Sequence, residues 1–246
     1  MISFYLERFT RSIARTFHLP AISRVFRFGF KLLPVLILMD IGYLVGAWPN
    51  WSLYSEGPIQ SSSFIRSYVF EQYHHRDWPE LRWQPVPIEK IPRNMIRALI
   101  VAEDSRFYEH SGVDTEALKL AMEHNLSEKK LAVGGSTISQ QMVKNVFLSS
   151  SRNPLRKWHE LVFTIGMERN LSKKRILELY LNVAEFGRGI YGVEAAARYY
   201  WGIPAAKLSD QQAIMLAATL PAPVNHNPET RTGFFKKRVQ KIQRYF

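Results

Sequence analysis

Apolar residues recur every three or four positions along most of the chain after Pro92, a period typical of amphipathic helices. The first such run predicts a helix that ends at two adjacent acids, Glu103 and Asp104. Its apolar face comprises Met95, Ile96, Leu99 and Ile100. The sequence contains no strand-like alternation of useful length and no internal repeat, so the pattern predicts a mainly α domain.

Residues that can cap a helix N-terminus stand before several of the expected helices. Thr137 and Ser209 each have a Gln three residues later, which is the spacing of a capping box. Asn153-Pro154 combines a cap with a proline favoured in the first turn. Asp114 and Ser172 are further caps. We therefore expect helices to begin just after these residues.

The helix that follows Asn153 carries apolar and charged residues on different sides. We expect its apolar positions to face the core, namely Leu155, Trp158, Val162 and Ile165. Its other side carries Arg156, Lys157, Glu160 and Thr164.

The N-terminal part of the chain combines a basic segment with an apolar one. Residues 1–31 are rich in Lys and Arg, whereas Asp40 is the only charged residue in 32–48. This order predicts a single transmembrane signal-anchor at 32–48, with residues 1–31 in the cytoplasm and the rest of the chain outside. A buried core helix and a cleaved signal peptide ending at residues 45–47 stay open as alternatives. Asp40 disfavours the anchor, because an acid at the bilayer centre costs about 2.5–3.5 kcal/mol.

Residues 49–84 are irregular and rich in Trp, Pro and Ser, which predicts a linker or wrapping arm with one short helix up to Val69-Phe70. Residues 85–246 would form the main domain. The chain of 246 residues is long enough for one well-buried domain with an appendage.

The formal net charge of +12 requires an anionic partner, which could be nucleic acid, a membrane surface or a phosphorylated substrate. The chain has no cysteine, which excludes disulfides and thiolate metal sites.

The acids and cations of the middle of the chain suit the transfer of a sugar away from a phosphate. Glu103, at the end of a helix, is the candidate base, and we expect the like charge of Asp104 to raise its pKa. A departing pyrophosphate needs positive charge, which Lys144, Arg152, Arg156 and Lys157 could supply together with the N–H groups after Gly134-Gly135. Glu160 could orient these cations or help to hold a metal-bound pyrophosphate.

Each of these features also has a structural interpretation. Glu160 and Arg156 could be a surface helix pair worth about 0.2–0.5 kcal/mol. Glu103 and Asp104 could be solvated, and the two glycines could be a turn. His110 is better explained as a structural hydrogen-bonding residue than as a base, because nothing near it in the sequence resembles a nucleophile.

Three segments together are more specific: residues 103–114 (EDSRFYEHSGVD), 135–145 (GSTISQQMVKN) and 156–160 (RKWHE). They resemble, in order and spacing, the motifs of the bacterial peptidoglycan glycosyltransferases, a family shared by class A penicillin-binding proteins and monofunctional biosynthetic transglycosylases. Residues 174–182, 189–197 and 220–223 are similar to the later segments of that family's domain. The resemblance covers about residues 85–230 and departs from bifunctional members at Glu185-Phe186, which leaves the role of that loop open.

This resemblance implies a mainly α, lysozyme-like glycosyltransferase domain that polymerises lipid II into β-1,4-linked glycan strands with inversion and release of undecaprenyl pyrophosphate. It implies Glu103 as the base and Glu160 as a second essential acid. The implied substrate-binding residues are Ser136, Thr137, Gln140, Gln141, Lys144, Asn145, Arg152, Arg156 and Lys157.

The resemblance further implies a divalent cation, Mg²⁺ or Mn²⁺, on the pyrophosphate, although the chain shows no dedicated metal-ligand set and no organic cofactor is expected. The implied partners are lipid II, the growing glycan strand, membrane lipid and proteins of cell wall synthesis or division, without nucleic acid. The expected location is the bacterial inner membrane with the catalytic domain in the periplasm. No Lys-Thr-Gly element of a transpeptidase domain is present, so we expect a monofunctional enzyme.

Two other classes of protein stay open. A lytic glycan hydrolase or transglycosylase would share the helical fold, but would need a protonated acid and would gain nothing from cations around a pyrophosphate. A non-catalytic membrane-bound scaffold or nucleic-acid binder would also explain the positive charge. A nucleic-acid binder, however, should show a groove-reading module or basic residues interleaved with aromatics.

Overall fold

The computed structural model describes residues 20–127, 134–149, 151 and 153–246, which divide into two compact units, one up to Trp48 and one from Pro49 to Phe246. The N-terminal unit contains helix α2 (Pro20–Gly46), in which most apolar side chains between Leu32 and Val45 are exposed. Among the described residues, no helix is both long and apolar enough to cross a membrane. The predicted transmembrane segment at 32–48 is therefore not confirmed. Residues 1–19 of the predicted cytoplasmic segment lie outside the described residues.

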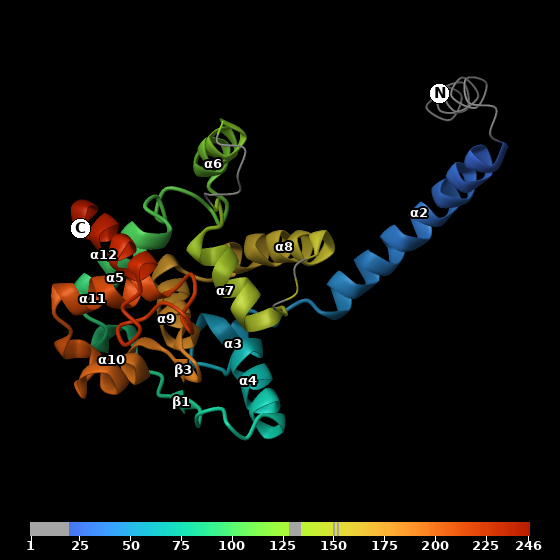
Figure 1. Cartoon of the computed structure of the whole chain (residues 1–246). Coiled ribbons are helices and arrows are strands. Elements are labelled where there is room, and N and C mark those ends of the chain that lie inside the picture. The colour runs from blue at the N-terminus through green and yellow to red at the C-terminus, as the bar shows by residue number, and fades with distance from the viewer. Residues whose placement is uncertain (1–19, 128–133, 150, 152) are drawn as a thin grey trace. The chain divides into compact units, whose positions relative to one another are not determined.

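The second unit is mainly helical, as the sequence predicts (Figure 1). Its α-helices are α3 (Ser52–Ser55), α4 (Ser63–His74), α5 (Arg93–Glu103), α6 (Thr115–Ser127), α7 (Ile138–Phe147), α8 (Pro154–Asn170), α9 (Lys173–Val183), α10 (Val193–Trp201), α11 (Asp210–Thr219) and α12 (Gly233–Tyr245). Two 3₁₀ turns span Ile88–Lys90 and Ala205–Lys207.

The predicted caps begin the helices as expected. Thr137 and Ser209 each form a complete capping box, at α7 and α11. The side chains of Asn153 and Ser172 accept backbone N–H bonds at the starts of α8 and α9, and Asp114 Oδ1 accepts from Ala117 N at 2.9 Å at the start of α6. These bonds satisfy N–H groups that have no partner within their helix.

The core of this unit lies where the central helices meet. Helix α5 packs against α11 and α12, and α7 packs against α8 and α9. Met95 and Leu99 of α5 and Ile138 and Met142 of α7 are almost completely buried. Helix α6 stands apart from this group of helices (Figure 1).

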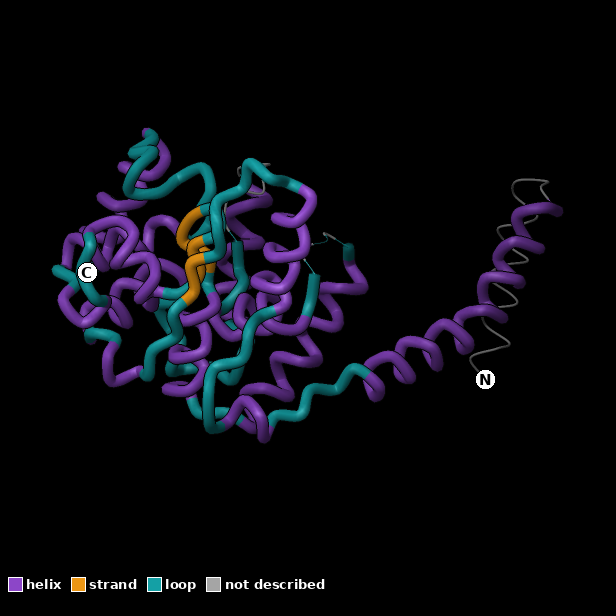
Figure 2. Tube along the Cα trace, turned by 90° about the horizontal axis from the view of Figure 1, so that it is seen from below, coloured by secondary structure: helices purple, strands orange, loops and turns teal. Residues whose placement is uncertain are grey.

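A three-stranded sheet, too short for the sequence pattern to reveal, joins the predicted arm to the main domain (Figure 2). Strand β1 (Arg82–Trp83) pairs in parallel with β3 (Ile190–Tyr191), which pairs antiparallel with β2 (Glu185–Gly187). Trp83 Nε1 donates to the carbonyl of Asn182 at 2.9 Å, and the Asn182 side chain accepts from Val86 N at 2.7 Å. The arm therefore packs within the same unit as the helices.

The prediction for the buried face of α8 was wrong. Leu155, Trp158 and Ile165 are 55%, 48% and 39% exposed, whereas Glu160 and Thr164 are buried. Phe163 and Met167 are buried beside them, so the inward face of α8 mixes apolar, small and charged side chains, while the three predicted core residues are exposed. Helix α6 is similar, since Leu118, Leu120, Met122 and Leu126 are all exposed.

Candidate active site

Glu103 is the last residue of α5, and its side chain is held inside the domain with 10% of its surface exposed. Its Oε2 accepts a hydrogen bond from Gln141 Nε2 of α7 at 2.7 Å. Gln141 Oε1 in turn accepts from the hydroxyl of Tyr180 on α9 at 2.9 Å. The sequence alternative of a solvated Glu103 is therefore wrong, and Gln141, expected among the substrate-binding residues, bonds the candidate base.

Burial raises the pKa of the Glu103 carboxyl above its ordinary value, and the positive charge of Arg238, the hydrogen bond from Gln141 and the charge of Lys144 oppose this. A raised pKa improves a carboxylate as a general base near neutral pH. The expected upward shift of the Glu103 pKa is thus confirmed. The expected cause of that shift was wrong, because burial raises this pKa and the like charge of Asp104 does not.

Asp104 does not share the partners of Glu103 and joins two elements instead. Its carboxylate accepts from the backbone N–H of Ile138, the first residue of α7, at 3.0 Å. It also accepts from His110 Nε2 at 3.0 Å, while Gly112 N donates to the other ring nitrogen at 3.1 Å. Both nitrogens of His110 therefore have structural partners, which agrees with the structural interpretation of this residue.

Asp104, His110 and Asp114 bring potential metal-ligand atoms within 4.8 Å of one another. These ligand atoms already have partners. Asp104 and His110 bond each other. Asp114 caps α6 and lies 3.7 Å from Arg106 Nε. This group does not fit a divalent cation, since binding one would remove the bonds that start two helices.

A second cluster surrounds Glu160 on α8, whose side chain is 3% exposed. Arg156 Nη1 donates to Glu160 Oε2 at 2.6 Å, and Lys157 forms an ion pair with Glu160 Oε1. Lys157 Nζ also donates to Ser136 Oγ at 3.1 Å. The surface-pair alternative is wrong, because a buried acid here holds two cations toward the segment before α7. Arg156 Nε is buried without a hydrogen-bond partner among the described residues.

Lys144 of α7 connects the two acids electrostatically. Burial lowers its pKa, the charges of Glu160 and Glu103 raise it, and Arg156 and Lys157 lower it. Lys144 lies one turn after Gln141, which bonds Glu103, and α7 packs against α8, which carries Glu160. This packing supports treating the base candidate and the cation cluster as one site.

Other residues implied by the resemblance have structural roles here. Thr137 Oγ1 accepts from Gln140 N and donates to the carbonyl of Gly112 at 2.6 Å, and Gln140 Oε1 accepts from Thr137 N. Both residues are buried, as is Asn145, and their role in substrate binding stays a prediction. Arg152 lies outside the described residues.

The sequence analysis missed Arg238 of α12. Its Nη2 forms an ion pair with Glu103 Oε1 and lies 3.3 Å from the carbonyl of Ala102. The two paired residues are 135 positions apart, and α12 is rich in lysine and arginine, so no local pattern singles out this one arginine.

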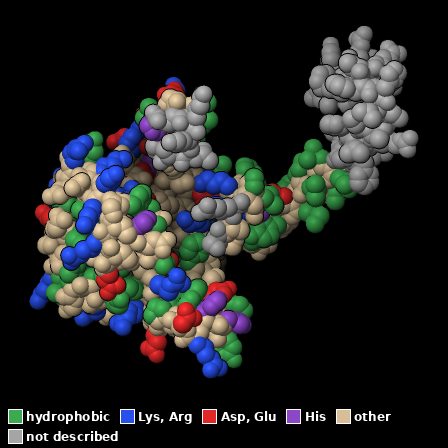
Figure 3. Space-filling model, in the orientation of Figure 1, with side chains coloured by type: hydrophobic (Ala, Val, Ile, Leu, Met, Phe, Trp, Pro, Cys, Tyr) green, Lys and Arg blue, Asp and Glu red, His purple; other side chains and the backbone are tan. Residues whose placement is uncertain are grey.

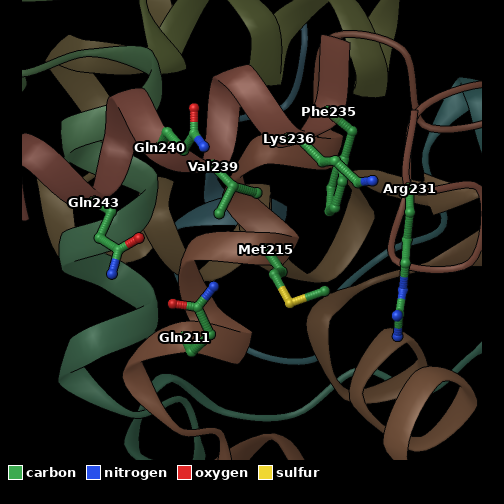
Figure 4. A pocket seen from close by; sticks show the side chains of 8 residues that line it. All are labelled: Gln211, Met215, Arg231, Phe235, Lys236, Val239, Gln240 and Gln243. Atoms are coloured by element: carbon green, nitrogen blue, oxygen red, sulfur yellow. The ribbon is translucent and has the colours of Figure 1, made fainter. Parts of the chain in front are cut away.

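A groove of about 460 Å³ lies between α11 and α12, on a side of α12 that does not carry Arg238 (Figure 4). Its lining includes Lys236, Gln240 and Gln243, which share one stripe of the helix, whereas Arg238 is offset from that stripe by about half a turn. The groove is therefore not the site of Glu103. Figure 3 shows Lys and Arg side chains spread over the part of the domain built by α5, α11 and α12, with few acids between them.

The helical domain places a buried carboxylate near a cluster of cations. These groups suit an enzyme that transfers a glycosyl group from a phosphate-bearing donor. The comparisons with known proteins agree with this class. The family model described as Transglycosylase matches residues 71–245. The chain belongs to the transglycosylase family.

Named relatives are similar over almost the whole chain. The biosynthetic peptidoglycan transglycosylase of Chromobacterium violaceum is 40% identical over 89% of this chain and 96% of its own length. The proteins of the same name from Nitrosomonas eutropha and Herminiimonas arsenicoxydans are 41% and 39% identical, over 86% and 91% of this chain and 87% and 96% of their own lengths.

Proposed function

We propose that this protein is a peptidoglycan glycosyltransferase that polymerises lipid II into β-1,4-linked glycan strands and releases undecaprenyl pyrophosphate. The observation that carries the proposal is the buried carboxylate of Glu103, bonded to Gln141 of α7, beside the helix α8 on which Glu160 holds two cations. The names of the relatives, biosynthetic peptidoglycan transglycosylases, support the substrate class. The lysozyme-like arrangement implied by the sequence belongs to the same proposal.

In the proposed reaction, Glu103 accepts the proton of the 4-hydroxyl of the acceptor sugar. The oxygen of that hydroxyl forms a bond to the anomeric carbon of the donor while the bond from that carbon to the pyrophosphate oxygen breaks. The bonding electrons leave with the pyrophosphate, and attack from the opposite face inverts an α-linked donor to a β-linked product.

The departing pyrophosphate carries negative charge that the cation cluster would stabilise. Lys144, Arg156 and Lys157 are the described cations near Glu160, and Arg156 Nε is a buried donor that a phosphate oxygen could satisfy. Glu160 holds Arg156 and Lys157 in place by direct ion pairs. We assign Glu160 to this orienting role, and Ser136 to the same binding region through its bond to Lys157.

A divalent cation, implied by the family resemblance, would sit on the pyrophosphate oxygens. Glu160 pairs with Arg156 and Lys157, and two positive charges beside it disfavour a further cation there, so the phosphate oxygens of the substrate would be the main ligands of the ion. No residue role above depends on this ion.

The lipid part of the substrate requires a membrane nearby, which we place at the outer surface of the bacterial inner membrane. The exposed apolar residues of α6 and α8, including Leu118, Leu126 and Trp158, support contact of the catalytic unit with lipid. Attachment through the N-terminal unit and association with other proteins of cell wall synthesis or division stay predictions.

The test is polymerisation of labelled lipid II by the full-length protein, compared with Glu103→Gln and with Glu89→Gln as a control. Glu89 is exposed and pairs only with exposed Lys174, so its variant should keep the wild-type rate. Glu103→Gln should lose about 10²-fold or more, the size expected for a removed general base. Cleavage of finished glycan without polymerisation of lipid II would instead show a lytic enzyme, and no reaction with either substrate would favour a binding role.

A further inference from the structure

Helix α12 supplies a partner of the candidate base from the far end of the sequence. Its buried residues Phe235, Val239 and Ile242 fix the helix on the domain, next to α5 and α11. Arg238, on a different side of α12, reaches the last turn of α5, where it pairs with Glu103 and donates to the carbonyl of Ala102. The position of this guanidinium is therefore set by the docking of a whole helix.

The carboxylate of Glu103 is held from two sides. Arg238 binds Oε1, and Gln141 binds Oε2 at 2.7 Å. Each carboxylate oxygen has two lone pairs, so both bonds leave capacity to accept the proton of an acceptor hydroxyl. Arg238 is itself only partly satisfied, because its Nε is buried without a hydrogen-bond partner among the described residues.

We propose that Arg238 is a positioning residue of the glycosyl transfer, which orients the carboxylate of Glu103 and keeps it ionised in its buried place. The role rests on the proposed function, in which Glu103 is the base. It makes α12 part of the active site, although α12 lies outside every segment that resembled the family motifs.

The surroundings of Glu103 explain why such a residue is needed. Burial raises the pKa of Glu103, and Arg238 is the strongest of the groups that lower it, ahead of Gln141 and Lys144. The other titratable group that faces it is Tyr180 of α9, whose own pKa burial raises well above its ordinary value, so that it stays neutral. Without Arg238, the carboxyl would become protonated at a higher pH, which would shorten the pH range in which Glu103 can act as a base.

The experiment compares the full-length wild type with Arg238→Gln, Arg238→Lys and the control Lys237→Gln. Lys237 is exposed and adjacent in sequence, so its variant changes the net charge equally without touching Glu103. Lipid II polymerisation is measured as a function of pH. The carboxyl titration of Glu103 is followed by ¹³C NMR of glutamate-labelled protein, with its signal assigned by its absence in Glu103→Gln. Thermal unfolding checks that each variant is folded.

Arg238→Gln should move the acidic limb of the rate profile and the titration midpoint of Glu103 to higher pH by about one unit or more, since a cation beside a carboxylate commonly lowers its pKa by 1–3 units. Arg238→Lys keeps the positive charge, so its rate profile and titration midpoint should stay close to those of wild type. Lys237→Gln should behave as wild type. The proposal would be overturned if folded Arg238→Gln kept both the wild-type position of the acidic limb of its pH–rate profile and the wild-type titration midpoint of Glu103, whatever the loss of rate. If wild type did not polymerise lipid II, the proposed function would fail, and the titration alone would still decide whether Arg238 keeps Glu103 ionised.

Discussion

Replacement of Asp104 offers a sharp test of how the site is built, because this acid adjoins the candidate base and yet has only structural partners. Its carboxylate binds the first backbone N–H of α7, at Ile138, and the Nε2–H of His110. Both the acid and the imidazole are buried, with side-chain exposures of 3% and 6%. Water therefore cannot easily replace a lost bond.

The cost depends on the number of donors that lose their acceptor. Asp104→Ala leaves two buried donors unsatisfied, at about 1–3 kcal/mol each, so we expect a loss of about 2–6 kcal/mol in the free energy of unfolding. Asp104→Asn keeps one carbonyl oxygen but turns an NH₂ group toward the other donor, so about 1–3 kcal/mol should be lost. For a chain of this size, 1 kcal/mol corresponds to roughly 2–4 °C in Tm.

Thermal and denaturant unfolding of the full-length protein would measure these losses, with Glu109→Gln as the matched control. Glu109 is 65% exposed, so its variant should stay within about 0.5 kcal/mol of wild type. The order of stability should be wild type, then Asn, then Ala. If Asp104→Asn unfolded like wild type but could not polymerise lipid II, Asp104 would be a group of the reaction and the reasoning would be refuted.

Three further predictions concern the same unit. The pKa of Glu103 is raised in the folded protein, so ionisation of this carboxyl lowers the stability of the fold as pH rises through that pKa. Glu103→Gln should therefore have a Tm at pH 7 at least equal to that of wild type. This difference in Tm should vanish below the ordinary pKa of glutamate. Glu160→Gln should lower the free energy of unfolding by about 1–3 kcal/mol and raise the KM for lipid II, because two cations lose their buried partner; unchanged values for both would contradict its orienting role. Gly189→Ala should lower Tm more than Gly202→Ala, because both have positive φ but a Cβ at 189 would meet the Tyr68 hydroxyl at 2.5 Å, whereas at 202 nothing lies within 4 Å; equal losses would show that the ring moves away freely.

The helices and their starts could be predicted from the sequence because their signals are local. A capping box such as Thr137 with Gln140 needs only four residues, and its bonds form wherever the helix begins. The helix that ends at Glu103 was predictable for the same reason, since its apolar period is complete within the segment.

The sides of α8 could not be predicted in the same way. Its apolar period suggested that Trp158 faces the core, but the buried side carries Phe163 and Met167 together with Glu160. Two cations on the same helix neutralise that acid. A hydrophobic pattern cannot reveal that a charged face is buried by mutual pairing, nor that an apolar face is left in solvent.

The residues of the candidate site likewise fall into those that local sequence motifs indicate and one that depends on long-range packing. Glu103, Lys144 and Glu160 lie in segments whose resemblance to a family is local, and the helices that carry them are joined through the hydrogen bond of Gln141 to Glu103 and the packing of α7 against α8. Arg238 could not be found, because its contact with Glu103 joins positions 135 residues apart and depends on how α12 docks. Gln140 also forms the capping box of α7, and its expected contact with the substrate stays a prediction.

The separation of Glu103 from Arg238 also orders events during biosynthesis. At a translation rate of about 5–20 residues per second, the ribosome needs roughly 7–27 s to synthesise the 135 residues between them. During that interval the nascent chain holds the acid without the cation that stabilises its ionised form, and α12 has not yet covered α5. If Arg238 orients the base as proposed, the site is complete only after helix α12 has emerged and docked, and a chain interrupted before residue 238 would lack the cation that pairs with Glu103.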